Sequence, residues 1–281
     1  MELLIKLYDF VTKTAEEPTN FGIYHIVCVL SVALLTVIAS KLFANSSDRV
    51  IRRISGILWV IVLLFEIYKQ TIYGLSLEDG KFVWDYAWYA FPFQFCSSPL
   101  YILPIIAFAK NEKLRDACVS YMMTFSLFAG LAVFCYPNDV FVETIGINLQ
   151  TMIHHGSQIF IGILYAVNYR GKLGKKFFLS GILVFVVMTF IAMTLNICTY
   201  HAFMKFGIDE TFNMFYISPY FDCTLPVLNL VYGRVPYVAF VCVYFFGFIL
   251  CALIVYGVIN GIMRAVKRSE MIKSEETDAA V

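Results

Sequence analysis

Seven long apolar stretches constrain the fold of this chain more than any other feature of its sequence. Each has at least 20 residues and at most two charged side chains, and they lie at 21–44, 54–73, 90–109, 114–136, 147–167, 177–200 and 236–263. At 1.5 Å per residue, every one of them can cross about 30 Å of hydrocarbon as an α-helix. We therefore expect an all-α, polytopic membrane protein with seven transmembrane helices.

The overall composition supports this class and excludes others. The 281 residues are 60% hydrophobic and only 15% charged, which is not the composition of a soluble domain. A net charge of +1 gives no reason to expect a nucleic-acid partner. The eight cysteines form no CxxC pair and no metal-ligand spacing, so we expect neither a bound metal nor a cofactor.

The distribution of basic residues predicts the orientation in the membrane. Of the 21 Lys and Arg residues, Lys69 lies in the outer half of stretch two, and fifteen lie between the last residues of stretches one, three and five and the first residues of the next, or in the C-terminal segment. The remaining five lie on the opposite side: Lys6, Lys13, Lys81, Lys205 and Arg234. Because basic loops stay in the cytoplasm, the N-terminus is expected outside and the C-terminus inside. We expect the cell membrane as the location.

The chain shows no internal repeat and no linker that would divide it. We expect one membrane domain over 1–266 and a charged cytoplasmic tail over 267–281. The connection 201–235 is rich in Phe, Tyr, Leu and Pro, which is too apolar for a freely solvated loop. It is therefore expected to be partly re-entrant or to lie on the outer surface.

Polar residues within the stretches converge at one depth. With the predicted orientation, those of stretches two, three and five lie in the outer half of the membrane: Glu66, Lys69, Gln94, Cys96, Gln150, His154, His155 and Gln158. Pro99 and Pro104 also make stretch three irregular, because proline removes a backbone donor. Since buried polar groups are expensive in a membrane, this convergence predicts a functional cavity.

A cysteine beside histidines favours acyl transfer. An imidazole can take the thiol proton, and the thiolate can then attack an ester carbonyl while an amide stabilises the oxyanion. The alternatives are structural. Cys96 can be a small packing residue, the histidines can bond neighbouring helices, and Glu66 and Lys69, three apart, can neutralise each other rather than bind a headgroup.

Helical geometry leaves the direction of Cys96 open. On an ideal helix, Gln94, Ser97, Ser98 and Tyr101 share one face, and Cys96 lies away from it. Either Pro99 redirects Cys96, or the thiol faces a different neighbour from its serines.

Several short segments carry a family resemblance. They are EIYKQ at 66–70, PFQFC at 92–96, His155-Gly156, Asn213-Met214 with Pro219, and GRVPY at 233–237. In these segments the chain resembles the YwaF-type integral membrane family. Members of that family are similar to the eukaryotic transmembrane acyltransferase of ether phospholipids and, more distantly, to the androgen-induced hydrolases of fatty-acid esters. The resemblance implies Cys96 as nucleophile and His155 as its partner, and it adds Asn213 to the expected substrate-binding residues. The family often has His where this chain has Gln94.

The sequence thus leads to one preferred function and one alternative. The preferred function is a membrane-embedded lipid acyltransferase or acyl-ester hydrolase that uses a Cys–His pair near the outer leaflet. The alternative is a transporter or lipid-binding protein without catalysis. A retinal protein is excluded, because stretch seven contains no lysine for a Schiff base. In each remaining case the expected partners are phospholipids or other acyl esters.

Overall fold

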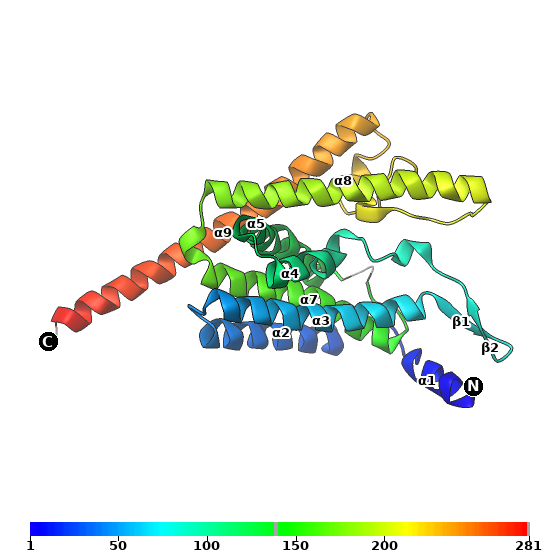
Figure 1. Ribbon diagram of the computed structural model, residues 1–281, viewed down its shortest axis with the longest axis horizontal. Coiled ribbons are helices and arrows are strands. Elements are labelled where there is room, and N and C mark those ends of the chain that lie inside the picture. The colour runs from blue at the N-terminus through cyan, green and yellow to red at the C-terminus, as the bar shows by residue number, and fades with distance from the viewer. Residues whose placement is uncertain (138–139, 280–281) are drawn as a thin grey trace.

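The computed structural model describes residues 1–137 and 140–279, most of which are helical (Figure 1). The helices are α1 (Glu2–Val11), α2 (Ile23–Leu42), α3 (Asp48–Ile72), α4 (Pro99–Phe108), α5 (Glu112–Tyr121), α6 (Leu127–Cys135), α7 (Ile145–Asn168), α8 (Lys175–Phe206) and α9 (Tyr237–Ala279). Strands β1 (Leu75–Glu78) and β2 (Lys81–Trp84) form an antiparallel hairpin.

Within the described residues, four helical segments are long and apolar enough to cross a membrane, by length and composition: Ile23–Leu42, Glu112–Cys135, Lys175–Phe206 and Tyr237–Ser269. They differ in burial. In the first and last, only 17% of the most apolar window is buried, against 72% for Glu112–Cys135. Long helices that are apolar but uncovered need lipid around them, so this is the architecture of an integral membrane protein.

Helix α7 lies at the centre of the bundle. Sixteen of its 24 residues are buried, and it packs against α2, α3 and α6. It also carries several buried polar side chains: Asn148, Gln150, Thr151, His154 and Gln158. Polar groups in such a position need partners inside the protein, which concentrates hydrogen bonding around this helix.

The segment between β2 and α4 differs from the continuous helix expected over 90–109. It contains two short 3₁₀ turns, Trp88–Ala90 and Phe95–Ser97, and the α-helix begins only at Pro99. Proline fits the first turn of a helix, where its missing N–H is not needed, so Pro99 starts α4 rather than kinking a longer helix. Pro104 lies inside α4.

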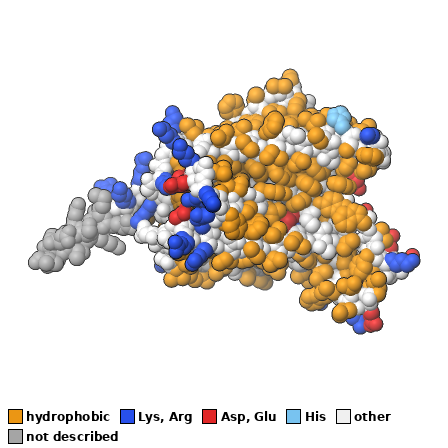
Figure 2. All heavy atoms as spheres, in the orientation of Figure 1, with side chains coloured by type: hydrophobic (Ala, Val, Ile, Leu, Met, Phe, Trp, Pro, Cys, Tyr) orange, Lys and Arg blue, Asp and Glu red, His pale blue; other side chains and the backbone are white. Residues whose placement is uncertain are grey.

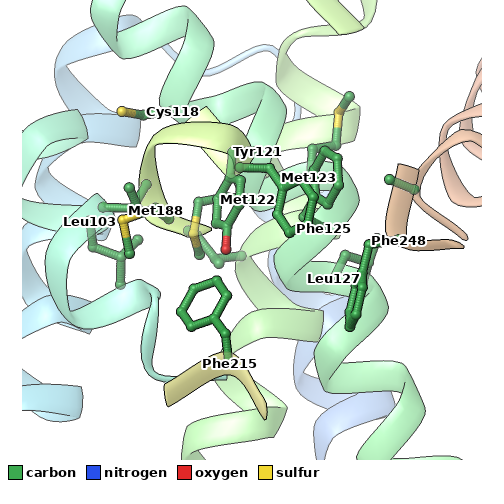
Figure 3. Packing of buried hydrophobic residues seen from close by; sticks show 14 of the residues in the cluster. Leu103, Cys118, Tyr121, Met122, Met123, Phe125, Leu127, Met188, Phe215 and Phe248 are labelled. Carbon is green, nitrogen blue, oxygen red and sulfur yellow. The ribbon is translucent and has the colours of Figure 1, made fainter. Parts of the chain in front are cut away.

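The core beside α7 is built on an irregular helix. The expected stretch 114–136 forms α5 and α6, which are joined by a π-helical segment, Met122–Ser126. Its side chains are buried among those of Tyr121, Met188 and Phe248 (Figure 3). A π segment widens the helix locally, and such segments are frequent beside functional sites.

The connection after α8 folds back onto the bundle. Helix α8 continues to Phe206, so only the part from Gly207 onward is loop. In this loop Phe215 adopts a left-handed conformation (φ 58°) and its ring packs against Phe93 and Phe95. Figure 3 shows Phe215 beneath Tyr121 and Met122. The high apolar content of this connection is therefore used for packing within the protein.

Helix α1 and the β1–β2 hairpin were not expected from the sequence. Helix α1 lies beside the hairpin in Figure 1, and the hydroxyl of Tyr8 donates to the Leu75 carbonyl at 2.7 Å. Both elements are too short and too polar to register as spanning stretches. They lie at the end of the molecule where α3 finishes.

We expect Gly130→Ala to destabilise the bundle. A Cβ at Gly130 would lie 2.7 Å from the backbone oxygen of His155, so α6 and α7 would have to separate. Overpacking of this kind costs about 1–3 kcal/mol, which thermal unfolding in detergent would detect as a lower Tm. Gly257→Ala is the control, since a Cβ there meets no atom within 4 Å. Equal Tm values for both variants would contradict the close packing of α6 on α7.

Candidate functional site

A cavity of about 390 Å³ lies between α3, the segment before α4, and α7. Its lining residues are Glu66, Lys69, Tyr73, Tyr89, Ala90, Gln94, Cys96, Ser97, Val140, Val142, Ile147, Gln150, Thr151, His154 and His155. Seven of the nine residues expected at a site from the sequence are among them. The other two, Gln158 and Asn213, contact lining residues from outside the cavity.

Cys96 is held in the wall of this cavity by its backbone. Nε2 of His154 lies 2.8 Å from the Cys96 carbonyl oxygen, and the Gln158 amide donates to the same oxygen. Cys96 lies in the 3₁₀ turn Phe95–Ser97, where an α-helical ladder does not consume this carbonyl. The ideal-helix geometry that placed Cys96 away from its polar neighbours therefore does not apply, because Cys96 is not part of an α-helix.

His155 is fixed in one tautomer by a hydrogen bond to the backbone of its own helix. Its Nδ1 lies 2.8 Å from the Thr151 carbonyl, which can only accept, so Nδ1 carries the proton. In the neutral ring, Nε2 then keeps its lone pair. Since His155 also lines the cavity, this nitrogen is the one available to a ligand or a thiol there.

His154 forms its hydrogen bond through the other ring nitrogen, Nε2. It donates from Nε2 to the Cys96 carbonyl, which leaves Nδ1 as an acceptor. Within the described residues, His154 Nδ1 is buried and has no hydrogen-bond partner. The two rings are adjacent, with centroids 5.6 Å apart and planes at 68°. Of the two histidines, His154 therefore holds the Cys96 carbonyl. Each ring keeps one nitrogen without a hydrogen bond among the described residues: Nδ1 of His154 and Nε2 of His155.

An ion pair forms the opposite wall. Lys69 Nζ lies 3.0 Å from Glu66 Oε1, as expected for a pair three residues apart on α3. The Gln70 amide donates to the same Glu66 oxygen at 2.7 Å and to the Ala90 carbonyl at 2.8 Å. Glu66 Oε2 is buried without a partner among the described residues. The pair is therefore structural, and it leaves one buried carboxylate oxygen without a donor.

Tyr86, in the segment after β2, supports this wall from outside the cavity. Its hydroxyl donates to Oε1 of Gln70. Burial, and then the nearby Glu66 carboxylate, raise the pKa of Tyr86 to about 12. Tyr86 therefore stays protonated at neutral pH and keeps the Gln70 amide turned toward Glu66.

Gln94 and Asn213 support the loop after α8. The Gln94 amide donates to the Asn213 carbonyl at 3.0 Å and accepts from the Phe215 N–H at 2.9 Å. The Asn213 side chain bonds Asp222 and Ser218 of its own loop. The Gln94 oxygen and one of its two N–H groups are therefore used to hold this loop. Gln150 also lines the cavity, and its side chain makes no hydrogen bond to another described residue.

Two tyrosines of the cavity were missed from the sequence. Tyr73 and Tyr89 contact each other edge to face at 5.9 Å, and Tyr89 is 55% exposed, so it marks the open side of the cavity. In a chain that is 17% aromatic, being a tyrosine does not distinguish a cavity residue from any other aromatic residue. Gln70 could have been found, since it stands four residues after Glu66 on the same helix face.

Metal ligation has no support among the described residues, where no group of three or more His, Cys, Asp or Glu side chains could hold an ion. Comparison with known proteins gives one result. The model of the TMEM164 family, a family of transmembrane proteins, matches residues 19–258, which include every residue that lines the cavity. No curated protein and no solved structure gives a match.

Proposed function

The chain belongs to the TMEM164 family, and we propose that it is a membrane-embedded lipid acyltransferase or acyl-ester hydrolase with Cys96 as nucleophile and His155 as general base. One observation carries the proposal. Cys96, His154 and His155 lie in the wall of a single cavity, together with a partly unsatisfied ion pair. Nucleophile, base and polar recognition groups in one concave site are the parts that acyl transfer needs.

In the proposed reaction, His155 Nε2 takes the proton of the Cys96 thiol as the sulfur attacks the ester carbonyl of a lipid. The tetrahedral intermediate collapses, the carbon–oxygen bond breaks, and the leaving alkoxide takes the proton from His155. The acyl chain remains on Cys96 as a thioester. Water or a lipid hydroxyl then attacks this thioester, with His155 again as base, which restores the thiol. Gln150 is proposed to donate to the oxyanion.

The acceptor atoms of the cavity support a polar lipid headgroup as ligand. Glu66 Oε2 and His154 Nδ1 are both buried acceptors without a partner among the described residues. Such atoms lack a donor in this arrangement, and a side-chain shift that exposes them would let a ligand hydroxyl or ammonium group supply one. Lys69 can in turn contact a phosphate or carbonyl oxygen, since it lines the same cavity. A phospholipid offers all of these groups.

The proposal includes seven transmembrane segments in a cell membrane, with the N-terminus outside. It is supported by the basic side chains, which gather at one end of the molecule (Figure 2). Glu66 and Lys69 lie near the C-terminal end of α3, whereas Arg49 and Arg53 lie near its start. With the basic end in the cytoplasm, the cavity is placed toward the outer leaflet.

Lipid binding or transport without catalysis is the second candidate, favoured by the Glu66–Lys69 pair. A zwitterionic headgroup matches such a pair and needs no nucleophile. In that case the cavity would bind phospholipid, but no covalent intermediate would form.

Trapping the thioester distinguishes the two functions. The protein is reconstituted in nanodiscs with phospholipids that carry an alkyne-tagged acyl chain, quenched in acid, and digested for mass spectrometry. We expect a hydroxylamine-sensitive label at Cys96. The lipid-exposed Cys135, Cys198 and Cys242 serve as internal controls. Equal labelling of these exposed cysteines would indicate non-enzymatic acylation, and lipid turnover without any label at Cys96 would contradict the covalent mechanism.

A further inference from the structure

A second cavity, of about 790 Å³, lies at the other end of α3, against α4. Its lining residues are Asp48, Arg49, Arg52, Arg53, Gly56, Ile57, Val60, Ala107 and Phe108. None of these residues lines the candidate catalytic cavity. It combines three arginines with an apolar wall, and this combination is independent of the proposed reaction.

The arginines divide into one structural and two free cations. Arg52 Nε donates to the Ala107 carbonyl at 3.0 Å and so fixes the end of α4 to α3. Arg49 and Arg53 are exposed, and no ion pair engages either one within residues 1–137 and 140–279. Asp48, the only acid of the lining, is neutralised by Arg115 at 3.3 Å and by Arg52 at 3.9 Å. The mouth of this cavity therefore has a positive charge available for an anion.

The wall below these cations is apolar and exposed. Ile57 is 63% and Phe108 is 64% exposed, and Val60 continues the same face of α3. Trp59 holds the Phe108 ring in an edge-to-face contact at 5.9 Å. From Arg49 to Val60 the helix rises about 16 Å, which is enough to accompany a large part of one acyl chain.

We propose that this cavity binds an anionic phospholipid. Its phosphate contacts Arg49 and Arg53, and one acyl chain lies along Ile57, Val60 and Phe108. Arginine pairs phosphate oxygens in a bidentate manner, and basic pockets between membrane helices bind lipid headgroups in this way. A free phosphate would use the arginines but not the apolar wall. The wall is therefore the reason for assigning the site to a lipid. Figure 2 shows the basic end bordered by a continuous hydrophobic surface.

Native mass spectrometry tests the assignment on the purified full chain. Phosphatidylglycerol is titrated against phosphatidylcholine of the same acyl length, and the bound lipid is counted. For Arg49→Gln/Arg53→Gln we expect affinity for phosphatidylglycerol to fall about tenfold or more, with phosphatidylcholine unchanged. The charge-matched control is Lys175→Gln/Lys176→Gln. It removes two exposed cations from α8, outside the cavity.

A second variant tests the apolar wall without changing charge. A Cβ at Gly56 has only ordinary contacts, 3.6 Å from Ala107 and 3.8 Å from Phe108, so Gly56→Leu is accepted by the backbone and fills the groove. We expect it also to weaken phosphatidylglycerol binding. Three results would overturn the proposal: binding equal to the wild type in the double arginine variant, an equal loss in the lysine control, or displacement of the lipid by millimolar inorganic phosphate. The last would indicate a site for the free anion.

Discussion

Cys96→Ala is expected to reduce acyl transfer by at least about 10³-fold while the protein remains folded. The sulfur is the only heavy atom removed. Without it no thioester can form, so the covalent mechanism is lost. Folding is expected to change little, since Cys96 lies at the wall of a cavity and its hydrogen bonds to His154 and Gln158 use the backbone carbonyl. The expected cost is about 1 kcal/mol or less.

The measurement is turnover of a panel of phospholipids in proteoliposomes, with released fatty acid and acylated lipid separated by mass spectrometry. Cys118→Ala is the control: this thiol is 1% exposed within the core and far from the reaction in the proposed mechanism. It should lose stability but keep turnover per folded molecule. Undiminished turnover of every tested lipid by Cys96→Ala would exclude Cys96 as nucleophile and favour binding without catalysis.

The long apolar helices outside the proline-rich region could be predicted from hydropathy alone, whereas the short α1 could not. The expected 147–167 forms α7 over Ile145–Asn168, and the expected 21–44 forms α2 over Ile23–Leu42. Apolar length is a strong signal because a helix satisfies every backbone group internally. The segment before Pro99 could not be predicted in this way, since some of its carbonyls, such as that of Cys96, accept from side chains distant in the sequence.

The contacts of the candidate site also divide into those set by spacing along one helix and those set by the tertiary fold. That Glu66 and Lys69 form a pair follows from their spacing on one helix. That Gln94 holds Asn213 and Phe215 follows only from how the loop after α8 folds back, because these residues lie 119 and 121 positions away in the chain. Likewise, hydropathy cannot show that His154 bonds the backbone of Cys96 rather than its thiol.

The two histidines provide the sharpest remaining test, because each can be replaced by an amide that keeps its observed hydrogen bond. The Nδ of asparagine stands near the position of histidine Nδ1, and the Nε of glutamine near that of Nε2. His155→Asn therefore keeps a donor for the Thr151 carbonyl but removes the basic Nε2. His154→Gln keeps a donor for the Cys96 carbonyl.

We expect His155→Asn to lower kcat by about 10²–10⁴-fold, which is the usual contribution of a general base. His154→Gln should lose less than about tenfold, since the contact that positions Cys96 is preserved. Turnover in proteoliposomes and thioester formation at Cys96 are both measured, with thermal unfolding as the control for folding. If His154→Gln were inactive and His155→Asn active, the roles would be reversed: the unengaged Nδ1 of His154 would be the base, and His155 would only anchor α7 through Thr151.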